Sequence, residues 1–559
     1  MLWYKGTRAK LGLAVQRLPS VPLKEHDPMN SRLDRRTFLR LASASAALLA
    51  QEARPQAASQ ATAQAASQTA PASATQRTQP TPRGPRAAVK SRKNFVGIQV
   101  RGFAWVDEGI DQVLDNIQKK GGVNTVWAYT FAYGEQRLRT GGGLPDHGTA
   151  LGPNNTGVNA GALYDYDLKY FQKTSVKDFR LTGYGKFNVI EQVAPKAKAR
   201  GMDFFAWDLN NPSPTLARNS ASYAALGEVD LTGRKTTNPC FNNPDYRTFL
   251  SGKIESLLIG YPELVDGIAW GCERMGPLDG ILQGSAGATC FCQFCQAKAQ
   301  QLGISVPRAQ AGLRELIQLF RSTGDQAPAD GYFTTFWRLL LKYPEVLSWE
   351  SLWTDSFQIV QAELYGLAKA IAPQKPFGFH IMQSMTFSPF YRAEEDYTKR
   401  KEFADFLKLA TYNNAGGPRM AAYLQSLSRG IFRDATPKDF LALYYKMMNY
   451  QEAPFDQLSA SGLSPDYVAK ETKRALVGVA GETKIYPGID IDVPVLGAGP
   501  AATDKRTKPE DVSRALRAAF GAGAGGVVLS REYVEMWLAN LTAAGDTLRE
   551  IFAQTASKS

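Results

Sequence analysis

Acidic residues stand at the ends of four short apolar runs, and at three of these places they lie beside aromatic or basic residues. The four places are Trp207-Asp208, Trp270-Gly271-Cys272-Glu273, Asp490-Ile491-Asp492 and Arg531-Glu532-Tyr533. Two carboxylates on either side of a glycosidic bond can supply the acid, base or nucleophile that cleaves it, provided that one has a raised pKa. Aromatic rings can stack on the apolar faces of sugar rings. The pattern is typical of enzymes that act on carbohydrates. For each single carboxylate, the alternative to a catalytic role is a structural ion pair.

The cysteines indicate a metal site. Three of the five form the run Cys290-Phe291-Cys292-Gln293-Phe294-Cys295. This close spacing disfavours disulfides among the three and favours thiolate ligands on one tetrahedral ion, so we expect zinc with a fourth ligand from Cys240 or Cys272. A site closed by four thiolates leaves no position for water, which indicates a structural role. Disulfide bonding and a redox or metal-handling protein are the alternatives.

A strand–helix alternation that starts at Asn94 would position these residues. Short apolar, β-branched or aromatic runs predict eight strands, at Phe95–Phe103, Thr125–Tyr133, Met202–Leu209, Val265–Glu273, Phe377–Met382, Phe406–Tyr412, Lys484–Ile489 and Gly526–Ser530. Eight strands that alternate with helices predict an α/β fold, a (β/α)8 barrel with long insertions after strands two and four. The second insertion, residues 274–374, carries the cysteine run. A doubly wound open sheet is the alternative.

Active sites of such barrels lie at the C-terminal ends of the strands. This rule predicts a set of substrate-binding residues: Arg101, Trp127, Trp207, Asp208, Trp270, His380, Asn413 and Glu532. The only histidines are His26, His147 and His380, which excludes a His-rich metal centre. The sequence contains no Gly-x-Ser-x-Gly motif to carry a nucleophilic serine, so it does not indicate an esterase.

The net charge of +13 belongs almost wholly to the N-terminal part. Up to Lys93 there are 16 Lys and Arg against 4 Asp and Glu, whereas the rest of the chain is nearly neutral. A neutral folded part argues against nucleic acid as a partner. No apolar run reaches about 18 residues, so we expect no integral membrane segment in the mature protein.

The N-terminal part has the features of an export signal. Arg35-Arg36-Thr37-Phe38-Leu39 precedes a short, weakly apolar stretch and resembles a twin-arginine signal. We therefore expect an upstream extension and signal peptide in 1–50, a disordered Ala/Gln/Ser/Pro-rich linker in 51–93, and the barrel in 94–559. The twin-arginine translocation machinery would be a partner, and the location periplasmic or extracellular. Met29 is an alternative start to Met1.

The middle of the chain resembles glycoside hydrolase family 42, the β-galactosidases of clan A. The resemblance rests on the segment Cys240-Phe241-Asn242-Asn243-Pro244-Asp245-Tyr246-Arg247, a strand that ends at Glu273, and the Cys-x-Cys-x-x-Cys run. It implies a structural zinc on Cys240, Cys290, Cys292 and Cys295, with Cys272 free. It also implies that Glu273 is the proton donor. Family members are often oligomers, which makes a homo-oligomer an option.

The chain departs from this family at two positions. Cys272 stands where the family has an asparagine, and Asp490 and Asp492 are the nearest candidates where the family has a nucleophilic glutamate. We expect a glycoside hydrolase that acts on an oligo- or polysaccharide through Glu273 and Asp490 or Asp492. The alternative is a carbohydrate-binding barrel without catalysis that keeps the zinc site.

Overall fold

The computed structural model describes Val89 and residues 92–133, 145–148, 160–181, 183–211, 213–285, 287–321, 327–491 and 505–557. The expected signal in 1–50, nearly all of the expected linker in 51–93, and Asp492 lie outside these residues. In the part of the chain that is described, no helix has both the length and the apolar character that a membrane crossing requires.

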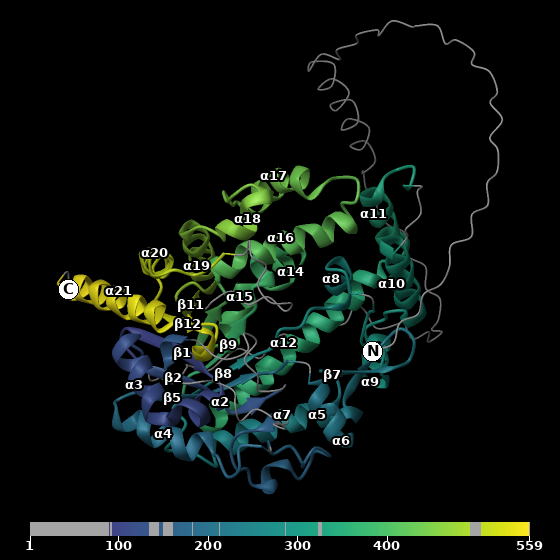
Figure 1. Ribbon diagram of the computed structural model, residues 1–559. Coiled ribbons are helices and arrows are strands. Elements are labelled where there is room, and N and C mark those ends of the chain that lie inside the picture. The colour runs from purple at the N-terminus through teal and green to yellow at the C-terminus, as the bar shows by residue number, and fades with distance from the viewer. Residues whose placement is uncertain are drawn as a thin grey trace, which may run out of the picture. The chain divides into compact units, whose positions relative to one another are not determined.

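Eight parallel strands close into a barrel (Figure 1). They are β1 (Phe95–Val100), β2 (Thr125–Tyr129), β5 (Asp203–Leu209), β8 (Gly267–Gly271), β9 (Phe377–Ile381), β10 (Phe406–Leu409), β11 (Lys484–Asp490) and β12 (Gly526–Ser530). The last strand pairs with the first, with Phe95 opposite Gly526. This closure confirms the predicted (β/α)8 barrel and rules out the open sheet. Strands β8 and β12 are four strands apart in either direction, so they face each other across the barrel.

Helices connect and cover the strands (Figure 1). In the first half of the chain they are α2 (Gly102–Ala104), α3 (Ile110–Asp115), α4 (Val189–Ala199), α5 (Pro214–Asn219), α6 (Ala221–Ala225), α7 (Pro244–Leu258), α8 (Pro277–Leu282) and α9 (Gln293–Gln301). In the second half they are α10 (Val306–Arg321), α11 (Tyr332–Lys342), α12 (Glu345–Ile371), α13 (Ser384–Phe387), α14 (Pro389–Glu394), α15 (Tyr397–Arg400), α16 (Asn413–Arg429), α17 (Pro437–Met448), α18 (Phe455–Ser461), α19 (Pro465–Val479), α20 (Pro509–Gly521) and α21 (Leu538–Ala556).

Additional short strands lie in the segments after β2 and after β5. Strand β3 (Phe131–Ala132) pairs with β4 (Gly161–Ala162), and β6 (Gly227–Val229) pairs with β7 (Lys235–Pro239), both antiparallel. The sequence pattern predicts neither pair, because runs of two to five residues are too short to show a period. The insertion after β8 holds α8 to α11, and it leads into α12, the longest helix described.

Aromatic side chains fill the inside of the barrel. Phe95 stacks on Tyr486 with ring centroids 4.1 Å apart, and Trp127 lies 5.5 Å from Trp207. All four are nearly or fully buried. A filled interior means that the barrel is a packed core rather than a pore, so a substrate can reach it only from its mouth.

Candidate active site

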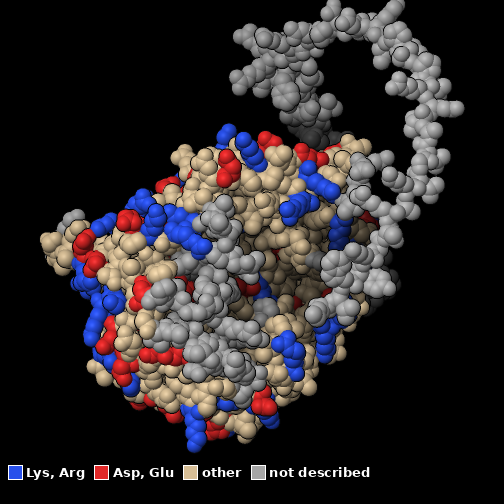
Figure 2. Space-filling view, viewed as in Figure 1, with Lys and Arg blue, Asp and Glu red and all other residues tan. Residues whose placement is uncertain are grey.

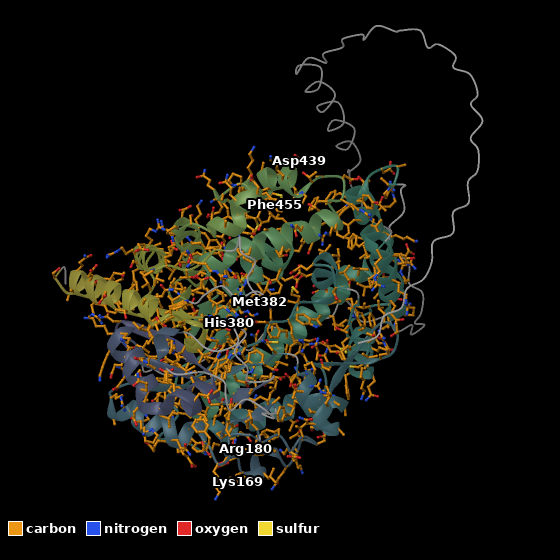
Figure 3. All side chains as sticks on the ribbon, in the orientation of Figure 1. Lys169, Arg180, His380, Met382, Asp439 and Phe455 are labelled. Atoms are coloured by element: carbon orange, nitrogen blue, oxygen red, sulfur yellow. The ribbon has the colours of Figure 1, made fainter. Side chains whose placement is uncertain are left out.

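The mouth of the barrel contains a cavity of about 540 Å³ at the C-terminal ends of the strands. Its acidic, basic and histidine lining residues are Arg101 after β1, Glu273 after β8, His380 on β9, Arg419 on α16, and Arg531 and Glu532 after β12. Figure 3 labels His380 and Met382, two lining residues of the β9 region, near the centre of the molecule. The volume falls in the range of small-molecule sites. Among the described residues, strand β11 contributes nothing to this lining.

Glu273 is held by a histidine. His380 Nε2 lies 3.1 Å from Glu273 Oε1, and Gly271 permits this approach because a Cβ there would come within 2.9 Å of the His380 Cβ. Burial and the charge of Lys408 lower the pKa of His380 to about 4, so its ring is neutral at pH 7 and donates from Nε2. The surrounding protein opposes ionisation of Glu273, although 42% of the side chain is exposed, but the His380 hydrogen bond and nearby positive charges bring its pKa to about 2. Glu273 is therefore an ionised carboxylate that faces the cavity.

Glu532 has the opposite electrostatic environment. Its side chain is almost fully buried, Tyr129 donates its hydroxyl to Oε1, and Arg101 Nε lies 3.6 Å from the same oxygen. Burial, which Arg101 only partly offsets, raises the pKa of Glu532 to about 7. Its second oxygen, Oε2, is buried and has no hydrogen-bond partner among the described residues. Glu532 lines the cavity, and a protonated carboxyl group there can donate a hydrogen bond or a proton to a ligand.

A buried lysine lies close to both carboxylates. Lys408 is in the middle of β10, is fully buried, and donates its Nζ to the Tyr412 hydroxyl. Burial lowers its pKa to about 7, although the charges of Glu273 and Glu532 act against this shift. Sequence analysis missed this residue. The signal was a single lysine inside the otherwise apolar run of strand six.

Asp490 does not reach the cavity. Its carboxylate is fully buried and accepts from the backbone N–H of Ala415 at 2.7 Å and from the Asn414 side chain at 2.8 Å. An acid at this position stabilises the N-terminus of α16, where the backbone N–H groups lack helical partners. Burial raises the pKa of Asp490 despite these bonds. Asp492 lies outside the described residues. The catalytic roles of both acids stay predictions, and the structure does not bring Asp490 together with Glu273.

The other predicted binding residues fall into two groups. Arg101, His380 and Glu532 line the cavity with Glu273. Trp127, Trp207, Asp208, Trp270 and Asn413 do not. Trp127 and Trp207 fill the barrel below the mouth, and Asn413 lines a separate, smaller pocket. Trp270 packs outward against Phe357 and Phe379, both at 6.1 Å.

Asp208 forms a buried ion pair with Lys253 of α7, and a stability prediction follows. Replacement of Lys253 with methionine leaves the carboxylate buried without its cation, so we expect the free energy of unfolding to fall by about 3–5 kcal/mol. Denaturant titration measures this change, with the exposed Lys173→Met as the matched control. The double variant Lys253→Met with Asp208→Leu should cost less than the sum of the two single changes. A loss of activity in Asp208→Asn with unchanged stability would contradict this role.

Four cysteines form a compact cluster. The Sγ atoms of Cys240, Cys290, Cys292 and Cys295 all lie within 4.8 Å of one another. The Sγ atom of Cys240 lies 3.5 Å from the Sγ atoms of both Cys292 and Cys295. Tetrahedral thiolates about 2.3 Å from one zinc ion would be about 3.8 Å apart, so the donor set fits such an ion. All five cysteines are free thiols, and the structure therefore contains none of the disulfides that the alternative required.

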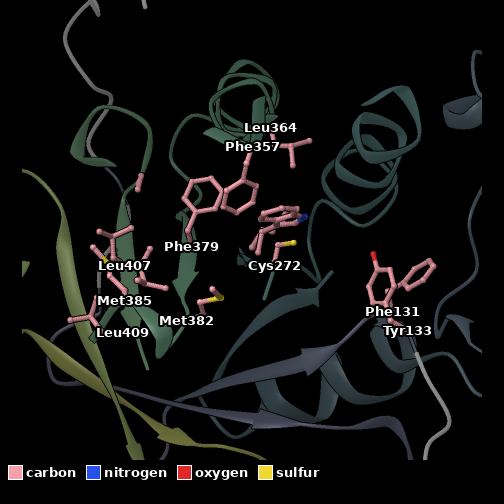
Figure 4. Close-up of a cluster of buried hydrophobic side chains, with 14 of the residues drawn as sticks. Phe131, Tyr133, Cys272, Phe357, Leu364, Phe379, Met382, Met385, Leu407 and Leu409 are labelled. Carbon is pink, nitrogen blue, oxygen red and sulfur yellow. The ribbon is translucent and has the colours of Figure 1, made fainter. Parts of the chain in front are cut away.

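Backbone and amide donors surround the cluster. The Val229 N–H donates to Cys290 Sγ at 3.4 Å, and Asn242 Nδ2 donates to Cys295 Sγ at 3.3 Å. Such donors stabilise thiolates. Cys272 is not a member of the cluster. It is buried among aromatic side chains near Phe357 and Phe379 (Figure 4).

Charged side chains outside the cavity are mixed. On the face in Figure 2, blue Lys and Arg residues are interspersed with red Asp and Glu residues. This agrees with the nearly neutral composition after Lys93.

The fold is similar to solved glycosidase structures. A β-galactosidase from the haloarchaeon Halorubrum lacusprofundi is 13% identical with a TM-score of 0.47, covering 82% of this chain and 58% of its own. A β-galactosidase from Rahnella sp. R3 is 15% identical with a TM-score of 0.46, covering 85% and 57%. The β-amylase catalytic domain of Paenibacillus polymyxa is 11% identical with a TM-score of 0.42, covering 84% and 100%.

These similarities describe the fold alone. The chain spans less than two thirds of the length of the β-galactosidases that it resembles. No protein-family model matches the sequence. No curated protein matches it either.

Proposed function

We propose that this chain is a glycoside hydrolase that cleaves O-glycosidic bonds of an oligo- or polysaccharide, with Glu273 and Glu532 as its two carboxylates. The observation that carries the proposal is their placement: they follow strands that face each other across the barrel, and both line one cavity. Their environments move the two pKa values in opposite directions. Such a pair supplies one ionised and one protonated carboxyl group at the same pH, which this hydrolysis requires.

The pKa directions assign the two roles. Glu532, protonated up to about pH 7, donates a proton to the leaving oxygen, and Glu273 acts as the ionised carboxylate on the other side of the bond. His380 fixes the orientation of Glu273, and Arg101 and Tyr129 fix that of Glu532. This assignment differs from the role of proton donor that the family resemblance implies for Glu273, and the pH profile distinguishes the two.

We expect kcat/KM on a panel of chromogenic glycosides and polysaccharides to fall as pH rises through about 7, because Glu532 then loses its proton. At low pH Glu273 stays ionised, so any loss of activity there should coincide with unfolding of the protein rather than with protonation of Glu273. Glu532→Gln should lose the part of the alkaline decline that Glu532 causes, whereas Lys408→Met, which removes the other nearby group with a pKa of about 7, should keep it. An alkaline decline that is unchanged in Glu532→Gln would contradict the assignment. Binding of sugar without release of reducing ends would favour the non-catalytic barrel.

We propose that the four-cysteine cluster holds one zinc ion. The support is the fit of the four Sγ positions to a tetrahedral ion and the closure of the site by thiolates. Such an ion would supply stability to the loop between β8 and α9 and would take no part in the reaction.

We also propose export through the twin-arginine pathway to the periplasm or beyond. The support is the sequence Arg35-Arg36-Thr37-Phe38-Leu39 ahead of a short apolar stretch. Cell fractionation of the paired variant Arg35→Lys with Arg36→Lys should find the precursor in the cytoplasm. Normal export of this variant would contradict the proposal.

A further inference from the structure

His147 is a buried histidine that does not line the cavity but connects two segments of the chain. It belongs to the short turn Pro145–His147, and its side chain is fully buried. Its Nδ1 lies 3.1 Å from Glu108 Oε2, and its Nε2 lies 2.7 Å from the carbonyl oxygen of Met536. The ring also packs against Tyr533, with ring centroids 5.0 Å apart. Each ring nitrogen therefore faces an oxygen atom at hydrogen-bond distance.

Both of these oxygen atoms are acceptors. A backbone carbonyl has no proton to donate. Glu108 is a carboxylate whose Oε1 already accepts from the Tyr533 hydroxyl at 2.6 Å and from Asn116 Nδ2 at 2.9 Å. A neutral imidazole has one N–H group, whereas an imidazolium has two. His147 therefore donates to both partners only when both of its ring nitrogens carry a proton.

The groups around His147 favour this doubly protonated form. Burial lowers the pKa of His147, but the Glu108 hydrogen bond, the Met536 carbonyl and the charges of Glu108 and Asp146 outweigh burial and raise the pKa above its ordinary value. The titratable groups on the elements packed around the ring are Glu108 on Trp105–Gly109, Asp146 on Pro145–His147, and Tyr533 and Glu535 on Tyr533–Glu535, of which Glu535 pairs with Arg531.

The contacts of His147 hold the turn that follows Glu532. The 3-10 turn Tyr533–Glu535 begins directly after Glu532, and the Met536 N–H closes it on the Tyr533 carbonyl at 3.1 Å. Tyr533 donates its hydroxyl to Glu108, and the Met536 carbonyl faces His147, so both ends of the turn are held. Glu108 itself lies in the segment after β1. The bridge therefore joins the segments that follow β1 and β12, which supply Arg101 and Glu532 to the cavity.

We propose that His147 is a positioning residue for Glu532, because its doubly protonated ring ties the turn after Glu532 to Glu108. This inference rests on the proposed glycosidase function and adds a regulation by pH to it. When the ring loses one proton, it can donate to only one partner, and either Glu108 Oε2 or the Met536 carbonyl loses its donor inside the protein, which is costly. The stability that the bridge supplies is thus present below about pH 6.5 and is lost as pH rises through the raised pKa of His147.

The variant Glu108→Gln separates the charge of His147 from its contacts. The amide oxygen can still accept from Tyr533 and Asn116, and the amide nitrogen can donate to the Nδ1 of a neutral ring. The ring then donates from Nε2 to the Met536 carbonyl, so the bridge no longer needs the additional proton. We expect the melting temperature of the wild type to fall as pH rises from about 6 to about 9, and Glu108→Gln to lose the part of this fall that His147 causes. The matched control is the exposed Glu263→Gln, which should keep the whole fall.

Nuclear magnetic resonance of protein with ¹⁵N-labelled histidine shows the protonation state directly. The chain has only three histidines, and His147→Gln identifies the signals of His147 by their loss. At about pH 6 both ring nitrogens of His147 should carry a proton in the wild type, and only one should do so in Glu108→Gln, because burial then acts without the opposing charge. A singly protonated ring in the wild type at this pH, or a fall in melting temperature that Glu108→Gln keeps in full, would overturn the bridge.

Activity tests the positioning role. At about pH 6, His147→Gln should lower kcat about tenfold or more, since a displaced Glu532 is misaligned with the leaving oxygen, and Glu108→Gln should lower it less because it keeps the bridge. Thermal unfolding shows whether each variant is folded, and an unchanged kcat in folded His147→Gln would refute the role of His147. The resonance and melting measurements need no substrate. A wild type that cleaves no saccharide would therefore refute the proposed function and leave the bridge itself intact.

Discussion

Replacement of Glu273 with glutamine is expected to lower kcat/KM by about 10³-fold, which lies within the range for removal of a group that transfers protons at the reaction centre. The amide keeps the size of the side chain and can still accept from His380, but it has no negative charge to place against the developing positive charge of the sugar. The protein should stay folded, because 42% of this side chain is exposed and the exposed part faces the cavity. Initial rates at pH 6 measure the loss.

Substrates with different leaving groups separate the roles of the two glutamates. An aryl glycoside whose leaving group is a weak base needs little protonation, so Glu532→Gln should recover much of its activity on it, whereas Glu273→Gln should not. The opposite result would support Glu273 as the proton donor, as the family resemblance implies. The exposed Glu263→Gln is the matched control for the change of charge. Full activity of Glu273→Gln on a substrate that the wild type cleaves would refute both assignments.

The barrel could be predicted because its strands are buried on both faces. Short apolar runs such as Phe377–Ile381 and Gly526–Ser530 stand out between helical patterns and need no partner to be recognised. The same double burial explains why the binding residues were harder to predict. In β5 and β8 large apolar side chains lie on both faces, so the sequence does not show which face points into the barrel. Trp207 and Ala269 point inward, whereas Asp208 and Trp270, which also pair in register, point outward.

The sequence also does not show how deep in the barrel a side chain lies, or which residues distant along the chain contribute to the cavity. Trp127 points into the barrel as a binding residue would, but it lies in a layer below the mouth. Arg419 comes from a helix, so an interpretation based on strand ends cannot find it. The cysteine cluster was predictable because three of its members lie within six residues, where chain geometry alone brings them together. The choice of Cys240 over Cys272 followed from the family resemblance, and the structure confirms that grouping.

The cysteine cluster is connected to the candidate active site through Glu228 of β6. Thr289, which precedes Cys290, donates its hydroxyl to Glu228 Oε2 at 2.8 Å, and Glu228 Oε1 lies 2.5 Å from Arg274 Nη2. Arg274 also donates to the carbonyl of Pro239, the residue before Cys240, at 2.8 Å. Arg274 follows Glu273 directly, and both Glu228 and Arg274 are buried. The loop that the metal would fix therefore also fixes the backbone at Glu273, the proposed catalytic carboxylate.

Removal of the metal is consequently expected to reduce both stability and activity. Elemental analysis should find about one zinc per chain in the wild type and well under one in Cys292→Ser, a change at a half-buried ligand that disturbs packing little. Because four thiolates would hold the ion, its loss should lower the free energy of unfolding by several kcal/mol. Activity should fall at temperatures where circular dichroism still shows the barrel, since the displaced loop releases Arg274 before the strands separate. Cys272→Ala is the control and should keep its zinc. A wild type that contains no zinc, and whose melting temperature and activity match those of Cys292→Ser, would rule out both the metal and its link to Glu273.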